Sequence, residues 1–471
     1  MKEECGVVGV VLPEAEPQSN SSAFQIYYGL YALQHRGQES TGITIHNGCS
    51  ANSIKGMGLV PEVYVKDDLK NLTGNVGIGH VRYSTSGNSG IENCQPLVVN
   101  FKGGTVAIAH NGNLVNACEL RDELESEGRI FITDSDTEVI AHLLVKQLLK
   151  HNIFDSIRQV MQRLVGSYSL TILIDGQLIA VRDPLGIKPL CIGEVEGGYA
   201  VASESVAIDT LNGKLLRDVY PGEVLFFNDG EIESYQLDNE KRSAHCVFEY
   251  IYFARPDSII DGKLVYKVRE KIGRVLADEH PVESDVVSPV PDSGITSAIG
   301  YSKESGIKYS EGLMKNRYIG RTFILPGQEM RDIAVRLKMN TISDNIDGER
   351  LILIDDSIVR GTTSKRIVNM IRDSGAKEVH ARIGSPPIIA PCYLGIDMAT
   401  REQLIASQNT IEGIRDMIGV DSIGYLSIDG LVEAIGINKN ELCLGCLTGR
   451  YPVEIYGEEC CAHLQSRLSE Y

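Results

Sequence analysis

Short apolar runs separated by glycine turns dominate the first half of the chain. Their length and alternation predict β-strands, and two segments with helical spacing interrupt them, Asp136 to Leu149 and Ile153 to Leu164. The predicted strands are Val7 to Leu12, Gly42 to His46, Val76 to Val81, Val106 to His110 and Ser169 to Arg182. Strand runs with helices between them indicate an α+β sandwich for residues 5–235.

The second half alternates strand-like and helical segments. Predicted strands are Asp285 to Val290, Leu351 to Ile354 and Val379 to Ile383, and predicted helices are Val265 to Leu276 and Thr363 to Ser374. This alternation is typical of a parallel, doubly wound α/β sheet. The polar stretch Gln236 to His245 lacks periodicity and is typical of a linker. The sequence therefore predicts a second domain over residues 246–471.

Composition restricts the class of protein. A chain of 471 residues has room for about two or three domains. The net charge of −18 argues against a nucleic-acid-binding or anionic-membrane surface, and no apolar run reaches the roughly 18 residues of a membrane span. Eleven cysteines at irregular spacing do not form a secreted disulfide framework. We therefore expect a cytoplasmic protein with reduced thiols and no membrane or nucleic-acid partner.

The run from Leu351 to Thr363 carries the clearest chemistry. A buried strand ends in two carboxylates, and ligands of open α/β sheets bind at such carboxyl ends. The polar residues of this run are Asp355, Asp356, Ser357, Arg360, Gly361, Thr362 and Thr363. Gly361 lets a phosphate approach the backbone, and we expect Thr362 and Thr363 to donate hydroxyls and cap the helix. Two carboxylates beside a phosphate favour a ligand with free hydroxyls or a divalent cation, such as a sugar phosphate. A solvated acidic turn is the alternative.

This run resembles the phosphoribosyl-pyrophosphate-binding segment of type I phosphoribosyltransferases. The resemblance implies that Asp355 and Asp356 serve the ribose hydroxyls and one Mg²⁺, and that the following loop wraps the 5-phosphate. It also implies a pyrophosphate loop at Asp292, Ser293 and Gly294 in SPVPDSG, with Ser293 near the metal. The basic segment Lys315 to Phe323, with Arg321, would be a mobile lid. An ordinary strand-to-helix turn and a solvated surface loop are the alternatives.

Four motifs in the first half concern a second site. Cys5 precedes an apolar strand, where a buried thiol would be the simplest explanation. Arg82 ends a strand in HVRYSTSG, and Asn111 and Gly112 form a predicted tight turn in HNGNLVN. Asp136 starts a helix in TDSDTE, where it could act only as a cap. The fourth motif is ALQHRGQES, residues 32–40.

Together these motifs resemble the class II glutamine amidotransferases, which are amino-terminal-nucleophile hydrolases with an αββα sandwich. The resemblance implies that Cys5 attacks the glutamine amide and that Asn111 and Gly112 form the oxyanion hole. Arg82 would bind the α-carboxylate of glutamine, and Asp136 its α-ammonium group. VRDPLGIKPL and ASES, residues 181–190 and 202–205, fit the same family.

Cys5 departs from the family pattern because the nucleophile should be the first residue. Its free α-amino group, with an unperturbed pKa near 8, is the local base in this family. The resemblance therefore implies a propeptide, Met1 to Glu4, that is removed before Cys5. A chain that keeps this segment should not hydrolyse glutamine.

Four cysteines form the last group of candidate site residues. Cys443 and Cys446 make a C-x-x-C loop, which alone is ambiguous between zinc, iron–sulfur and redox use. Cys246 and Cys392 are two further candidates, and by spacing alone zinc or plain core thiols are as good an explanation. In context all four resemble the cluster-bearing branch of the glutamine phosphoribosylpyrophosphate amidotransferases. That resemblance implies one 4Fe–4S cluster.

The combined resemblance implies an enzyme that converts 5-phosphoribosyl 1-pyrophosphate and glutamine to 5-phosphoribosylamine, glutamate and pyrophosphate. This is the first committed step of purine biosynthesis, with ammonia passed internally between two sites. It further implies a homo-oligomer, dimer or tetramer, inhibited by purine nucleotides. Arg331, Arg336 and Lys338 are candidate phosphate contacts, and an exposed basic helix is the alternative. An inactive or regulatory paralogue that only binds the sugar pyrophosphate is the alternative. Glutamine-dependent pyrophosphate release would distinguish the two.

Overall fold

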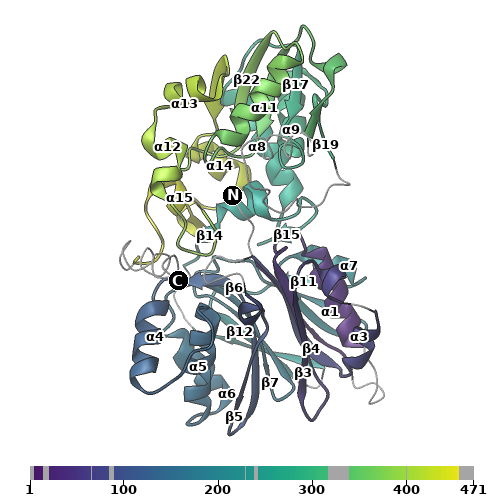
Figure 1. Ribbon diagram of the computed structural model, residues 1–471, viewed down its shortest axis with the longest axis vertical. Helices are drawn as coiled ribbons and strands as arrows, with labels where there is room; N and C mark the ends of the chain where they lie inside the picture. Colours follow the sequence, from purple (N-terminus) through teal and green to yellow (C-terminus); the bar gives the residue numbers. More distant parts are fainter. Residues whose placement is uncertain are drawn as a thin grey trace.

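A computed structural model describes residues 5–13, 21–64, 66–83, 90–228, 230–237, 242–316, 339–398 and 400–455. The amino-terminal and carboxyl-terminal halves form two parts stacked along the long axis of the molecule (Figure 1). Within the described ranges, no helix is both long and apolar enough to cross a membrane.

The amino-terminal half is built on two antiparallel sheets. The first has the order β11-β9-β10-β1-β4-β2-β3, and the second β13-β12-β8-β7-β6-β5. Their strands are β1 (Gly6–Val11), β2 (Ser40–His46), β3 (Ala51–Met57), β4 (Val76–Arg82), β5 (Leu97–Phe101), β6 (Gly104–Leu114), β7 (Gly166–Ile174), β8 (Gln177–Arg182), β9 (Cys191–Val195), β10 (Gly198–Ala202), β11 (Lys214–Asp218), β12 (Glu223–Asn228) and β13 (Glu231–Gln236). The predicted single run Ser169 to Arg182 is a hairpin, because Asp175 and Gly176 turn the chain at positive φ.

Helices cover the outer faces of these sheets. The first sheet is covered by α1 (Ser21–Ala32), α2 (Val60–Val63), α3 (Lys66–Asn71) and α7 (Ser205–Thr210), and the second by α4 (Ala117–Ser126), α5 (Asp136–Leu148) and α6 (Ile153–Met161) (Figure 1). Apolar side chains such as Val7, Ile78, Ala107 and Leu178 are buried between the sheets. Burial on both faces explains the nearly continuous apolar strands. The predicted αββα sandwich is confirmed.

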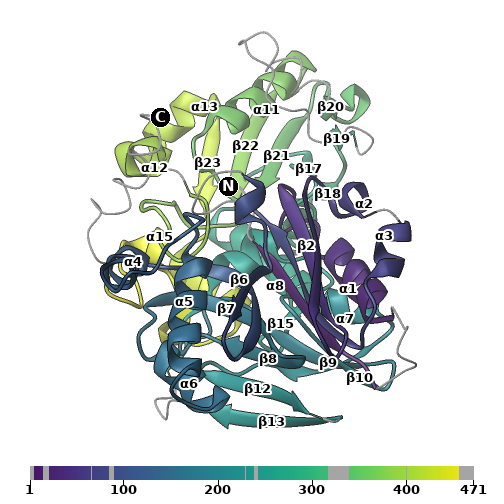
Figure 2. The ribbon, with the colours of Figure 1, turned by 60° about the horizontal axis from the view of Figure 1, so that its bottom comes forward.

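The carboxyl-terminal half has a five-stranded parallel sheet of order β18-β17-β21-β22-β23 (Figure 2). Helices pack on both of its faces, so adjacent residues such as Leu351 and Ile352 enter different cores. Its elements are α8 (Val265–Glu279), β17 (Val286–Pro289), α9 (Ile295–Ser305), β18 (Lys308–Tyr309), β21 (Arg350–Asp355), α11 (Thr362–Asp373), β22 (Glu378–Ile383), α12 (Ile405–Gln408), α13 (Ile411–Ile418), β23 (Ser422–Tyr425) and α14 (Ile428–Ile435). The predicted doubly wound sheet is confirmed.

Numbered in chain order, the strands lie across the sheet as 2-1-3-4-5, so the strand order reverses between β17 and β21. The loops that leave those two strands diverge at a topological switch point, where α/β folds bind ligands.

Short elements join the halves. They are β14 (His245–Cys246), η2 (Glu249–Phe253), β15 (Ile259–Ile260), β16 (Lys263–Leu264), β24 (Leu442–Cys443) and α15 (Gly445–Thr448), with β19 (Leu313–Lys315) and β20 (Met339–Thr341) beside the sheet. β14 pairs in parallel with β24. Gln236, which begins the predicted linker, is still the last residue of β13.

Two candidate active sites and a cysteine cluster

Cys5 directly precedes β1, which is the central strand of the first sheet. The next residue, Gly6, pairs with Val81, which places Cys5 beside the end of β4. Its thiol is buried and donates a hydrogen bond to the carbonyl oxygen of Tyr83 at 3.4 Å. Burial raises the pKa of this thiol to about 11. A nucleophile at this position therefore requires a nearby base to take its proton.

Asn111 and Gly112 lie on β6, in an environment that suits an oxyanion hole. Both polar atoms of the Asn111 side chain are buried, and neither has a hydrogen-bond partner among the described residues. Buried unpaired amides are rare in folded proteins and often mark a functional position. Gly112 has φ +152°, and a Cβ at this position would lie 2.0 Å from the carbonyl oxygen of Ser167. Only glycine therefore fits here.

Arg82 and Asp136 lie within electrostatic range of the Cys5 thiol. Arg82 is buried, and its Nη1 donates to Glu39 Oε1 at 2.8 Å. Asp136 begins α5, after the N-cap Ser135, and its Oδ2 accepts from the Leu114 backbone N–H at 3.0 Å. Burial alone would raise the pKa of Asp136, but His110 and backbone N–H groups hold it below its usual value.

A segment of the other half packs against the candidate oxyanion strand. Asn113 Nδ2 donates to the carbonyl oxygen of Tyr393 at 2.9 Å, and Ser167 Oγ donates to that of Leu394 at 2.8 Å. A Cβ on Gly395 would lie 3.0 Å from the carbonyl carbon of Gly112. No sequence pattern indicates this contact, although Asn113 lies within the HNGNLVN motif.

The second candidate site lies at the switch point between β17 and β21. Ser293, after β17, donates through Oγ to Asp356 Oδ1 at 2.5 Å, and Ser357 donates to Asp356 Oδ2 at 2.6 Å. Burial and the neighbouring Asp356 charge raise the pKa of Asp355 well above its usual value. Carboxylate oxygens are the ligands that a hard divalent cation prefers, and a cation bound here would offset their negative charge. The two predicted motifs, distant in sequence, therefore meet.

Two glycines shape the loops of this site. Gly294 precedes α9, and a Cβ there would lie 2.4 Å from the carbonyl oxygen of Ile354. Gly361, with φ +74°, is the N-cap of α11 and has no side-chain cap. The expected capping by Thr362 and Thr363 is therefore wrong, since the helix begins at Thr362 itself. The remaining predicted residues are Asp292, whose Oδ2 accepts from Lys315 Nζ at 2.8 Å, the exposed Arg360, and Arg321, which lies outside the described residues.

The four predicted ligand cysteines converge at the junction of the halves. Cys246 and Cys443 are register partners in the β14–β24 pair. The backbone N–H groups of Ile389 and Ala390 donate to the carbonyl oxygen of Cys446, which ties the segment before Cys392 to the same place. After burial, the neighbouring Cys392, Cys443 and Cys246 raise the pKa of Cys446 further, well above its usual value.

Within the described ranges, no three His, Cys, Asp or Glu side chains form a group that could hold a metal ion. The four-thiol donor set from three segments nevertheless fits an iron–sulfur cluster, which is larger than one ion and is bound by thiolates.

Known proteins match this chain over nearly its full length. A glutamine amidotransferase domain model matches residues 80–210. The amidophosphoribosyltransferase of Archaeoglobus fulgidus is 56% identical over 459 residues, covering 97% of this chain and 99% of that protein. The Bacillus subtilis protein of the same name is 46% identical and covers 99% of this chain and 98% of that protein. The structure of glutamine phosphoribosylpyrophosphate amidotransferase from B. subtilis, complexed with ADP and GMP, superposes with a TM-score of 0.90 at 46% identity, over 96% of this chain and 98% of that one. The chain therefore belongs to the amidophosphoribosyltransferases, a family of enzymes of purine biosynthesis.

Proposed function

We propose that Cys5 hydrolyses glutamine to glutamate and ammonia once Met1 to Glu4 have been removed. The released α-amino group of Cys5 then takes the thiol proton, which the raised thiol pKa makes necessary. The thiolate attacks the amide carbon, and the developing oxyanion accepts hydrogen bonds from the Asn111 side chain and the Gly112 backbone. The C–N bond then breaks as the protonated α-amino group gives its proton to the leaving ammonia, and water hydrolyses the glutamyl thioester to glutamate and free thiol. Arg82 binds the α-carboxylate of glutamine, and Asp136 binds its α-ammonium group.

The other half uses the ammonia. Asp355 and Asp356 orient the ribose hydroxyls of phosphoribosyl pyrophosphate, and the loop from Ser357 to Thr363 surrounds the 5-phosphate. Asp292, Ser293 and Gly294 bind the pyrophosphate, and Arg321 closes over it. Ser293, Asp355 and Asp356 would hold one Mg²⁺, which neutralises charge on the leaving pyrophosphate. Ammonia forms the new bond at ribose C1 as the C1–O bond to pyrophosphate breaks, which gives 5-phosphoribosylamine.

A closed path between the sites would keep ammonia from protonation in bulk water. The packing of residues 393–395 against the oxyanion strand supports such a path, because it joins the two halves directly beside the glutamine site.

Cys246, Cys392, Cys443 and Cys446 would hold one 4Fe–4S cluster with a structural role, since neither reaction transfers electrons. Because the thiols come from separate segments, cluster loss should loosen the junction of the halves. Iron and sulfide analysis of anaerobically purified protein, compared with Cys443→Ser, tests this. A fully active, processed protein that contains zinc or no metal would contradict it.

Purine nucleotides are the proposed inhibitors, in keeping with the ADP and GMP of the B. subtilis structure. The candidate contacts Arg331, Arg336 and Lys338 lie outside the described residues. We further propose a cytoplasmic homo-oligomer. Inhibition that is not competitive with the sugar pyrophosphate and survives Arg331→Ala with Lys338→Ala would contradict the regulatory assignment.

The observation that carries the glutaminase assignment is the buried amide of Asn111, which lies beside Gly112 on β6 and has no hydrogen-bond partner among the described residues. A sharp test supplies glutamine labelled with ¹⁵N at the amide together with unlabelled ammonium. Label should enter 5-phosphoribosylamine in step with pyrophosphate release. No turnover by processed protein with either nitrogen source would favour the non-catalytic alternative. Product that carries no label would contradict the glutaminase assignment.

A further inference from the structure

A buried ionic network joins the backbone of Cys5 to both halves of the molecule. Its centre is Arg36, which is 1% exposed and lies in the ALQHRGQES motif. Arg36 Nε donates to the carbonyl oxygen of Cys5 at 3.0 Å. No step of the proposed reaction uses this arginine, yet it holds the backbone of the nucleophile directly.

Two buried carboxylates orient the guanidinium, one from each half. Glu204, from the ASES motif, accepts from Arg36 Nη1 at 2.6 Å. Glu249, the first residue of η2, accepts from Nη2 at 2.6 Å and from Nη1 at 3.0 Å. The Glu249 contact is bidentate, the arrangement that fixes guanidinium geometry best. The orientation of Arg36 therefore depends on a residue of the phosphoribosyl half.

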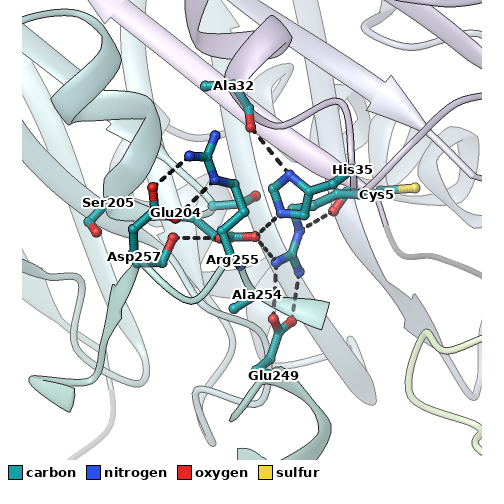
Figure 3. A network of polar contacts seen from close by, with 12 residues as sticks. Cys5, Ala32, His35, Glu204, Ser205, Glu249, Ala254, Arg255 and Asp257 are labelled. Atoms are coloured by element: carbon teal, nitrogen blue, oxygen red, sulfur yellow. Dashed lines mark hydrogen bonds and ion pairs between the residues drawn. The ribbon is translucent and has the colours of Figure 1, made fainter. Parts of the chain in front are cut away.

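Glu204 extends the network across the junction. Its Oε1 contacts His35 Nε2 at 2.7 Å, and its Oε2 accepts from the Arg255 backbone N–H at 2.9 Å and Ser258 Oγ at 2.6 Å. Figure 3 shows His35, Glu204, Glu249 and Arg255 converging beside Cys5. Burial alone would raise the pKa of Glu204, but His35 and Arg36 hold it well below its usual value. The carboxylate thus stays ionised and keeps its partners.

A second buried arginine leads from Glu249 towards the acidic pair. Arg269 on α8 donates through Nε to the carbonyl oxygen of Tyr250 and through Nη2 to that of Ala254, both at 2.8 Å. These two acceptors lie in and directly after η2, the turn that carries Glu249. Burial lowers the pKa of Arg269 to about 10, although Asp356, Glu204 and Glu249 favour its charged form. Arg269 therefore fastens the backbone of η2 to α8, within electrostatic range of Asp356.

We propose that Glu249 is a positioning residue for glutamine hydrolysis: through Arg36 it fixes the backbone of Cys5, so the phosphoribosyl half aligns the nucleophile of the other half. The inference rests on the proposed function, in which Cys5 is that nucleophile. A displacement of about 1 Å at a reacting group can cost roughly 100-fold in rate. Loss of one carboxylate from a buried pair leaves the guanidinium free to tilt.

The test compares Glu249→Gln with a matched control, Glu223→Gln. Glu223 is equally buried and makes the same bidentate contact with Arg217, at 2.7 and 2.8 Å, but within the amino-terminal half alone. Glu249→Gln should lower kcat/KM for glutamine by about 10- to 100-fold, mainly through kcat. Ammonia-dependent synthesis and the melting temperature should change no more than in the control. Intact mass should show slower removal of Met1 to Glu4, because the same backbone is displaced.

A double-variant cycle separates positioning from simple docking. If Glu249 acts through Arg36, then Arg36→Gln combined with Glu249→Gln should be no worse in glutamine kcat/KM than Arg36→Gln alone. Additive losses, equal loss of the ammonia-dependent reaction, or glutamine kinetics matching Glu223→Gln would each overturn the proposal. Failure of the proposed function gives a different signature, namely glutamine use by Cys5→Ser.

Discussion

The two candidate sites differ in how much of their geometry is fixed by the fold. Cys5, Arg82, Asn111 and Asp136 are all buried, and each lies in or beside a strand or at the start of a helix. At the second site, between β17 and β21, three loop or first-turn residues are exposed, namely Arg360, Thr362 and Thr363. The anchor of that site is the buried Asp356, which accepts a hydrogen bond from the partly buried Ser293 hydroxyl.

This difference follows from the chemistry of each half. Hydrolysis of a small neutral amide needs donors that are aligned before the oxyanion forms, so a rigid sheet can carry an unpaired amide. A sugar pyrophosphate is large and highly charged, so its site must admit a polyanion and then enclose it with loops. Substitutions in the first site should therefore act on the rate of glutamine use, and those in the second on substrate binding.

The largest effect is expected for Gly112→Ala. At φ +152°, the added Cβ would lie 2.0 Å from the backbone oxygen of Ser167, and the clash can be relieved only by shifting β6 or β7. Glutamine-dependent synthesis should fall by about 1000-fold or more, as expected when an oxyanion hole is lost. Gly48→Ala, at φ +88° with no atom within 4 Å, is the control for positive φ alone. Comparable kinetics for the two variants would contradict the assignment.

Asn111→Leu should separate stability from activity. Removing the donor should lower kcat for glutamine by about 100- to 1000-fold. Because the wild-type amide is buried and has no partner in the part of the chain that the structure describes, the apolar side chain should leave stability unchanged or raise it by about 1 kcal/mol. Denaturant unfolding and steady-state kinetics measure both. A destabilised but active variant would show that the amide has a structural partner instead.

Asp356→Asn probes the other half. It should lower glutamine-dependent and ammonia-dependent synthesis equally, by about 100-fold, because both reactions need the same acceptor. Asp373→Asn, at an exposed position on α11, provides the control. Loss of only the glutamine-dependent reaction would show that Asp356 acts in glutamine hydrolysis and not in phosphoribosyl transfer.

Gly361→Ala should have the smallest effect and sharpens the contrast with Gly112. Its added Cβ would meet Ile405 Cδ1 at 2.5 Å, the end of a flexible side chain that can rotate away. The remaining cost of a left-handed alanine is about 1–2 kcal/mol, which the free loop can relieve by leaving this conformation. Because phosphate binding must restore the conformation, KM for the sugar pyrophosphate should rise roughly 10-fold. KM for glutamine should not change. Gly419→Ala, at φ +83° with open space, controls for the helix terminus.

The sequence predicted the layers and the motif positions because these depend on local pattern. Alternating or continuous apolar runs indicated strands, and Asp355 and Asp356 fell at a strand end as expected. The hydroxyl cap at Thr362 was wrong because tertiary packing places Gly361 at the N-cap position in a left-handed conformation. Such a choice depends on neighbours such as Ile405 that no local pattern contains.

Contacts between the halves could not be predicted at all. Arg36 and Glu204 each lie within a recognised motif, and Glu249 lies in none. Nothing in their spacing shows that one guanidinium binds two carboxylates 168 and 213 residues away in the chain. The same holds for Asn113 and Tyr393. Long-range polar pairs of this kind are specified by the whole fold.

The most direct test of the division between the two sites is Cys5→Ser, assayed with glutamine and, separately, with ammonia at high pH. Glutamine-dependent synthesis should fall to background, while ammonia-dependent synthesis should stay within about threefold of the processed wild type. Equal loss of both activities, or continued use of glutamine, would contradict the account.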